Sequence, residues 1–177
     1  MQAPIRIAAL LAILLAGCAA PPIDHYSKEL PRFDPSVFFA GHTEAWGMFQ
    51  KRSGEVARRF TVDMQGAWQG KEFVLNESFV YSDGEKQHRQ WHLVRTGEDQ
   101  WEGTASDVVG KASGQQAGNA LQWQYLLTVP VGSSSYNFSF DDWSYLIDET
   151  HAVNRASMRK FGIEVGQVTL FFVKPNA

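Results

Sequence analysis

The sequence predicts an all-β fold, a lipocalin-like antiparallel up-and-down barrel or a strongly curled sheet of about 8–10 strands. From residue 41 onward, apolar and polar residues alternate with a period close to two, the period of a strand with one buried face. The breaks between these segments are short and rich in turn-forming residues, such as Ser82 to Glu85. Short connections favour hairpins and hence a barrel, whereas a Greek-key sandwich, the alternative, needs long crossovers.

The expected strands follow one another along this whole region. They cover residues 46–51, 55–64, 73–81, 86–95, 101–108, 121–129, 136–143, 152–161 and 167–174. Gly110, Gly114 and Gly118 have the spacing of turn glycines, so we expect no strand between residues 110 and 118. No segment of this region sustains a helical period over about three turns.

Residues 1–17 have the pattern of a secretory signal peptide, with one basic residue, Arg6, an apolar run and then two small residues. The apolar run, residues 7–15, is shorter than the roughly 20 residues that a membrane-spanning helix needs. We therefore expect this segment to be removed from the mature protein.

The tetrapeptide Leu15 to Cys18, LAGC, resembles the bacterial lipobox, in which the cysteine thiol accepts a diacylglyceryl group before cleavage. Cys18 is the only cysteine in the chain, so we expect it to be lipidated and to anchor the protein to a membrane. Ala19 stands where an Asp would imply retention in the inner membrane. The lipobox resemblance therefore implies an outer-membrane protein that faces the periplasm.

Three parts are expected along the chain: the signal peptide at 1–17, a lipid-anchored, proline-containing tether at 18–40, and one β-barrel domain at 41–177. With the single cysteine lipidated, no disulfide is available and the barrel depends on its core. The formal net charge of −3 offers no basic field, so nucleic acid is excluded as an expected partner.

Strand phase predicts which charged residues share the inward face with aromatic neighbours. Five charged residues are in phase with apolar inward positions: Arg58, Glu77, Arg89, Asp142 and Arg155. Three arginines against two acids leave one guanidinium in surplus, and a guanidinium binds the oxygens of a carboxylate or phosphate in pairs. Together with Trp91 and Trp123, this set predicts a site for an amphipathic anionic ligand, such as a fatty acid or another lipid-like molecule. The alternative is a structural salt-bridge cluster, or strand ends that face water.

Asp141 and Asp142 are adjacent on an expected strand, so they point to opposite faces and make a poor acid/base pair. Asp142 is expected inside, neutralised by Arg58, Arg89 or Arg155, and Asp141 outside. On this reasoning Asp142→Asn destabilises the fold by leaving an arginine unpaired, whereas Asp141→Asn does little.

No metal site, cofactor or catalytic residue is expected. His88 and His92 are four residues apart, which on a strand separates them by roughly 13 Å at about 3.3 Å per residue, too far for one ion. The sequence contains no nucleophile elbow, phosphate-binding glycine loop or Cys-His pair. A cofactor-free enzyme that uses a desolvated carboxylate as a base is kept as the least favoured alternative.

The sequence also resembles a family of Gram-negative envelope lipoproteins of unknown function. The motifs that carry this resemblance are RRFTVD at 58–63, FDDW at 140–143 and NRASMRKFG at 154–162, within matching stretches that cover most of the mature chain. The resemblance implies an envelope lipoprotein with a β fold and supplies no activity. Two functions remain open: a binding module for the amphipathic ligand, and an envelope scaffolding or interaction protein whose barrel core is packed.

Overall fold

The computed structural model describes residues 21–175, and over this range the chain forms a closed barrel of ten antiparallel strands. The strands are β1 (Gly41–Lys51), β2 (Val56–Gln69), β3 (Glu72–Tyr81), β4 (Lys86–Arg95), β5 (Gln100–Thr104), β6 (Ala112–Ala117), β7 (Ala120–Val131), β8 (Ser134–Leu146), β9 (His151–Lys160) and β10 (Ile163–Val173). Two short helices, η1 (Ile23–Tyr26) and α2 (Pro35–Phe38), precede them. The predicted lipocalin-like barrel is confirmed, and Cys18 and the signal peptide lie outside the described residues.

Each strand pairs with its neighbours in sequence, and β1 closes the barrel by pairing with β10 from Glu44↔Val173 to Lys51↔Gly166. Pairing of the first and last strands covers the two edges that an open sheet would expose. The short strands β5 and β6 cover only parts of their neighbours, so β4 pairs with β5 over His92–Arg95 alone. The alternation expected from the sequence is clear on β2, where Val62 and Met64 are buried and the residues between and beside them are exposed.

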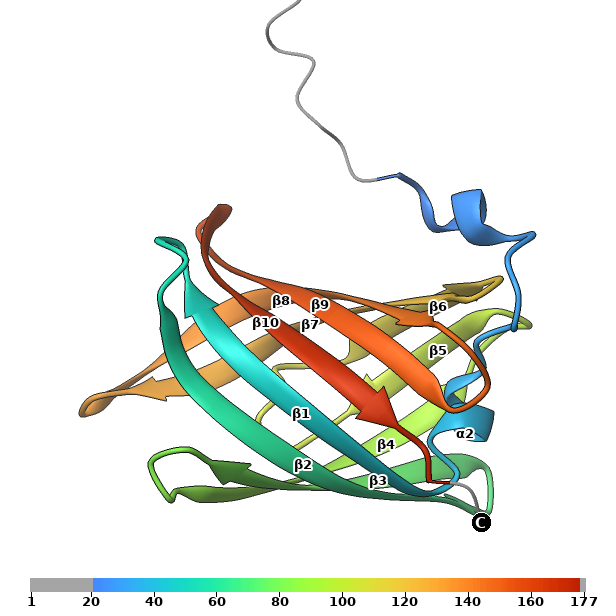
Figure 1. Cartoon of the computed structure of the whole chain (residues 1–177), viewed down its shortest axis with the longest axis horizontal. Coiled ribbons are helices and arrows are strands. Elements are labelled where there is room, and N and C mark those ends of the chain that lie inside the picture. Colours follow the sequence, from blue (N-terminus) through green and yellow to red (C-terminus); the bar gives the residue numbers. More distant parts are fainter. Residues whose placement is uncertain (1–20, 176–177) are drawn as a thin grey trace, which may run out of the picture.

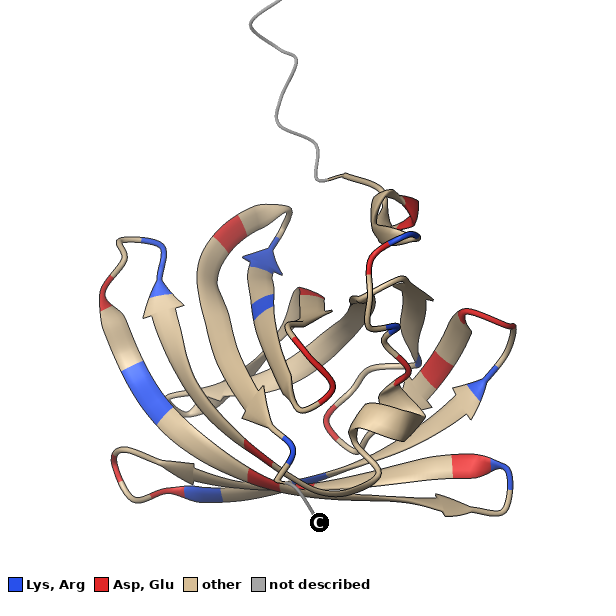
Figure 2. Cartoon of the chain, turned by 45° about the vertical axis from the view of Figure 1, so that its right-hand side comes forward, with Lys and Arg blue, Asp and Glu red and all other residues tan. Residues whose placement is uncertain are grey.

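Hairpins gather at both ends of the barrel (Figure 1). The connections β1–β2, β3–β4, β7–β8 and β9–β10 form the left end in this view, and α2 lies at the right end. In Figure 2, which shows the chain from a second side, acidic and basic residues are interspersed at the strand ends and turns. None of the helices in the described part of the chain is both long and apolar enough to cross a bilayer.

The prediction of turns throughout residues 110–118 is wrong, because Ala112–Ala117 forms strand β6. Gly114 serves close packing within this strand rather than a turn. A Cβ on Gly114 would lie 2.3 Å from the ring of Trp123, and one on Gly103 of β5 would lie 2.4 Å from it. The two glycines therefore make the space that the indole of β7 occupies inside the barrel.

The prediction of a simple tether over residues 18–40 is also wrong for its described part, because residues 33–39 fold across one end of the barrel. Phe33 is fully buried, and the rings of Phe38 and Phe39 pack edge-on against Phe172 of β10 with centroids 6.4 and 5.5 Å apart. Phenylalanines in this segment bury apolar area that a tether would expose to water. We call residues 33–39 the plug.

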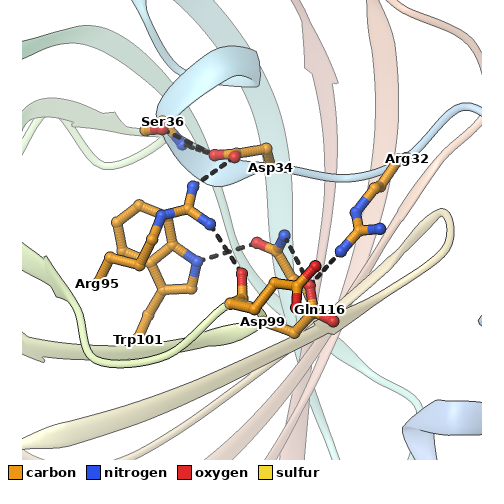
Figure 3. Close-up of polar contacts among 8 residues, drawn as sticks. Arg32, Asp34, Ser36, Arg95, Asp99, Trp101 and Gln116 are labelled. Atoms are coloured by element: carbon orange, nitrogen blue, oxygen red, sulfur yellow. Dashed lines mark hydrogen bonds and ion pairs between the residues drawn. The ribbon is translucent and has the colours of Figure 1, made fainter.

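A polar network fastens the plug to the strands beneath it (Figure 3). Asp34 caps α2 by accepting from the Ser36 backbone N–H at 2.9 Å, and its other oxygen accepts from Arg95 of β4. The Arg95 guanidinium lies 4.3 Å from the ring centroid of Trp101, a cation–π contact. The Trp101 indole is buried and donates to Gln116 Oε1 at 2.9 Å, so each polar group of this network has a partner.

Candidate functional site

The barrel encloses a cavity of about 640 Å³, a size typical of small-molecule sites. Its walls are mainly inward-facing aromatic and aliphatic side chains of the long strands. The plug residue Phe39 and its neighbour Phe172 line the closed end, and the lining reaches the exposed residues Glu85 and Pro130 at the opposite end. The alternative of a packed barrel core is wrong, because the cavity is far larger than a few water molecules.

Four aromatic rings form a continuous wall of the cavity. Trp91 of β4 packs edge-on against Trp123 and Tyr125 of β7, with ring centroids 5.7 and 5.5 Å apart. Tyr125 in turn stacks on Phe140 of β8 at 5.1 Å with the two planes almost parallel. Trp91 and Trp123, both predicted as ligand contacts, therefore lie where the sequence places them.

Arg89 is the centre of a largely buried charge cluster that lines the cavity. Its Nη2 and Nε donate to Asp107 Oδ2 at 2.8 and 3.0 Å, and its Nη1 lies 3.6 Å from Glu77 Oε2. Glu77 and Arg89 face each other directly in the β3–β4 register. Burial alone would lower the pKa of Arg89, but the two carboxylates outweigh it and raise that pKa.

Burial raises the pKa of Glu77, and Arg89 offsets only part of this effect. Glu77 Oε2 has no hydrogen-bond partner among residues 21–175, so its contact with Arg89 is purely an ion pair. Asp107, which lies in the connection between β5 and β6, was not among the predicted site residues. Its inward position could have been predicted from the strand period, because Asp107 is an even number of residues from Trp101 and Gly103, which are both buried.

Asp142 is inside the barrel, as predicted, but the expected neutralisation by an arginine is wrong. Its Oδ2 accepts from the Tyr125 hydroxyl at 3.2 Å, and its Oδ1 has no hydrogen-bond partner. Within residues 21–175 no arginine forms an ion pair with Asp142, because Arg89 is held by its own two acids. Burial raises the pKa of Asp142 from 3.8 to about 7, although the Tyr125 hydroxyl bond opposes this shift.

Asp141 lies on the outer face, as predicted. It accepts hydrogen bonds from Gln122 Nε2 at 2.7 Å and Gln124 Nε2 at 3.1 Å, both on the neighbouring strand β7. The two adjacent acids of β8 therefore have separate environments, one polar and partly hydrated, the other largely apolar.

Arg58 and Arg155, the other two arginines predicted inside, do not join the Arg89 cluster. Arg58 lines the open end, where it donates to Asp83 at 2.8 Å and Glu85 at 2.6 Å and lies 3.6 Å from the ring centroid of Tyr81. Arg155 is exposed on the outside of β9 and donates to Gln167 Oε1 at 3.1 Å.

The inward phase predicted for β9, which placed Arg155 inside together with Val153 and Phe161, is wrong. Phe161 lies in the β9–β10 turn, 92% exposed and with a positive φ of 50°. The inward positions of β9 are instead the small residues Ala152 and Ala156 together with Asn154 and Met158, all of which are buried. Small inward side chains gave no apolar signal strong enough to set the phase.

The charge balance of the cavity is the reverse of the one predicted. The charged residues of its lining are Arg58, Glu77, Glu85, Arg89, Asp107 and Asp142. Four acids therefore face two arginines, and both arginines already have two carboxylate partners. The predicted surplus guanidinium does not exist among the lining residues, and the surplus is acidic.

Outside the barrel, His42 and Glu44 of β1 and Asp63 of β2 place one potential metal-ligand atom each within 4.8 Å of one another. His42 Nε2 is 2.7 Å from Asp63 Oδ2, and all three side chains are partly exposed to solvent. We interpret this group as a surface ion pair with a neighbouring acid, which contributes little to stability.

The closed ten-stranded sheet and its internal cavity define the chain as a lipocalin-like barrel protein. The S-type phycobiliprotein lyase CPES from Guillardia theta has a similar fold, with a TM-score of 0.58 over 89% of this chain and 99% of the lyase chain. The two sequences are 7% identical, so this similarity concerns the fold alone.

The chain belongs to the family described as protein of unknown function (DUF3833), whose model matches residues 12–174. The predicted membership of an uncharacterised family is therefore confirmed, while the lipoprotein character stays a prediction. No curated protein matches the sequence.

Proposed function

We propose that the protein is an envelope lipoprotein that binds a lipid-like, amphipathic small molecule inside its barrel. The observation that carries this proposal is the apolar cavity of about 640 Å³, which is closed at one end by the plug and reaches the surface at the other. Enclosed apolar walls remove most of a ligand's apolar surface from water, which contributes about 25 cal/mol per Å². A barrel with a merely structural role would gain stability from filling this space.

The charged groups of the cavity are separated from its apolar, plugged end, as an amphipathic ligand requires. The apolar end near Phe39 and Leu93 suits the body of the ligand, and the charged groups lie farther toward the open end. The anionic polar group predicted from the sequence is not part of the proposal, because no guanidinium of the lining is free to receive it.

The anchor proposed for this protein is a lipid on Cys18, which lies outside the described residues and would hold the barrel at the outer membrane, facing the periplasm. A shift of the protein out of the outer-membrane fraction in Cys18→Ser, with loss of incorporated palmitate, supports this part of the proposal. Unchanged palmitate labelling of Cys18→Ser would contradict it.

Ligand binding can be tested on the mature chain, residues 18–177, with Cys18→Ser, which contains every described residue. Native mass spectrometry after mild purification from a Gram-negative host is expected to show an added small-molecule mass. Ala156→Phe places a ring in the cavity, because Ala156 is a buried lining residue directly opposite Asp142. This variant should lose the added mass and bind the neutral dye Nile red at least tenfold more weakly.

Arg155→Phe is the matched control, since it adds the same ring one residue away on the outer face of β9. It should bind Nile red like the parent chain. Equal dye affinity in all three proteins, together with no copurified molecule, would refute ligand binding in the cavity.

A second function, a cofactor-free enzyme, is favoured by one observation: Asp142 lines the cavity with a pKa of about 7, suited to proton transfer at neutral pH. Such an enzyme would convert the molecule that copurifies with it into a chemically different product. Comparing the masses of the molecules bound by the parent chain and by Asp142→Asn tests this, and identical bound molecules would exclude a role for Asp142 in chemistry on them.

A further inference from the structure

Around Asp142 and Glu77, the acids of the cavity have less positive charge beside them than they need to balance their own. Arg89 is shared between Asp107, which takes two of its nitrogens at 3.2 Å or less, and Glu77, which is 3.6 Å away. Asp142 has only the neutral hydroxyl of Tyr125. Three carboxyl groups therefore depend on one guanidinium.

Hydrogen bonding does not make up this deficit. Glu77 Oε2 and Asp142 Oδ1 are both buried, and neither accepts a hydrogen bond from residues 21–175, although Trp91 acts on the Glu77 carboxyl group as a hydrogen-bond donor and lowers its pKa. A carboxylate removed from water needs donors or an opposite charge, and leaving it without either is costly. Such a carboxyl group must take up a proton or meet a cation brought into the cavity.

The rings beside these acids suit a cation rather than an anion. Trp91, Tyr125 and Phe140 pack together on the cavity wall, and Asp142 Oδ2 accepts a hydrogen bond from the Tyr125 hydroxyl. Aromatic faces carry negative potential and attract ammonium groups within about 6 Å of the ring centroid. The carboxyl groups and the aromatic faces therefore both attract a positively charged group of a ligand.

We propose that the cavity selects an amphiphile whose polar group is a cation, an alkylammonium or arylammonium group, received by Asp142 and Glu77 beside the aromatic wall of Trp91 and Tyr125. This inference rests on the proposed function, because it assigns the polar group of the ligand that the cavity binds. The ammonium group replaces the missing counter-charge, and the apolar body fills the plugged end.

The same groups discriminate against a fatty-acid-like anion. A carboxylate at this depth faces Asp142 and Glu77. The two arginines among the described lining residues, Arg58 and Arg89, are each already engaged by two carboxylates. Specificity then comes from like-charge repulsion as much as from attraction to the cation.

The test compares three probes with the same alkyl chain: dodecyltrimethylammonium, dodecanol and dodecanoate, each below its micellar concentration. Displacement of Nile red from the mature Cys18→Ser chain at pH 8.5 measures their affinities. The cation is expected to bind at least tenfold more tightly than the anion, with the alcohol between them.

Asp142→Asn should lower the affinity for the cation by about tenfold, change that for the alcohol little and raise that for the anion. Glu77→Gln should act in the same direction. Asp141→Asn, which removes the adjacent charge on the outer face, is the matched control and should leave all three affinities unchanged.

Equal affinities for cation and anion, or tighter binding of the anion, would overturn the cation preference while leaving ligand binding in place. Loss of selectivity in Asp141→Asn to the same extent as in Asp142→Asn would also overturn it, because a general surface potential would then explain the preference. Displacement of the dye by none of the three probes would count against the proposed function itself.

Discussion

Replacing Asp142 by Asn is expected to stabilise the barrel at alkaline pH and to change its stability little at pH 5. In the folded protein burial raises the pKa of Asp142 from 3.8 to about 7. Below the lower value both folded and unfolded chains are protonated at this site. As the pH rises toward 7, the unfolded chain ionises first, so unfolding becomes easier.

The size of this effect follows from the shift of the pKa. A shift of about three pKa units corresponds to ~4 kcal/mol of lost stability above pH 7, since each unit is worth about 1.4 kcal/mol. Asn keeps the shape and can still accept from the Tyr125 hydroxyl, but it cannot ionise. Its amide group stands without an acceptor where Oδ1 lies, which costs about 1–3 kcal/mol.

The assay is urea unfolding of the parent and Asp142→Asn chains at pH 5 and pH 8.5, followed by tryptophan fluorescence. The parent chain should lose about 3 kcal/mol relative to the variant between the two pH values, because the unfolded chain is already largely ionised at pH 5 and part of the ~4 kcal/mol is lost there. Glu77, whose pKa is also raised, and the other cavity groups Arg89, Asp107 and Tyr125 are present in both proteins, so the difference isolates Asp142.

Asp141→Asn is the control, because Asp141 is hydrogen-bonded on the outer face. The unfolding free energy of this variant should follow that of the parent chain at both pH values. A constant difference in unfolding free energy between the parent chain and Asp142→Asn at pH 5 and 8.5 would refute the reasoning. The expected direction at alkaline pH is opposite to the one that the sequence predicted, since that prediction assumed an arginine partner which Asp142 lacks.

Other substitutions test the remaining contacts. Arg89→Met leaves two buried acids without a counter-charge and should cost about 3–5 kcal/mol in urea unfolding, whereas Arg58→Met, at partly exposed pairs, should cost less than about 1 kcal/mol. Phe33→Ala, at the fully buried centre of the plug, should cost about 3–5 kcal/mol and increase the rate of Nile red exchange. Gly118→Ala should lower the melting temperature by far more than Gly70→Ala, because its Cβ would lie 1.7 Å from the Tyr26 carbonyl oxygen, whereas nothing lies within 4 Å at Gly70. Equal stability losses within either of the two pairs would contradict the corresponding contact.

The order of the strands and the direction of most side chains could be predicted from the sequence, because both are local consequences of a period of two. Large apolar residues set the phase of β2, β3, β4 and β7, and with it the inward positions of Arg58, Glu77 and Arg89. The phase failed on β9, where Ala152 and Ala156 face inward and too little apolar area marks the buried side.

The partners of the inward charges could not be predicted, because they come from elements distant in sequence. Asp107 and Glu85 line the cavity from connections between strands, and Arg155 faces outward, so the predicted balance of cavity charges had the wrong sign. The plug could not be predicted for a similar reason. The phenylalanines at 33–39 follow no regular period, and they become buried only when the barrel has formed around them. Long-range contacts of this kind are fixed by the assembled fold.

The pairing of β1 with β10 also sets the order in which this chain can fold. β1 is made long before its partner β10, so the seam cannot form until all the strands between them have been synthesised. Until then Phe38 and Phe39 lack the wall that Phe172 provides. Contacts between such distant segments slow folding, so closure of the seam and seating of the plug are expected to be one late, cooperative event.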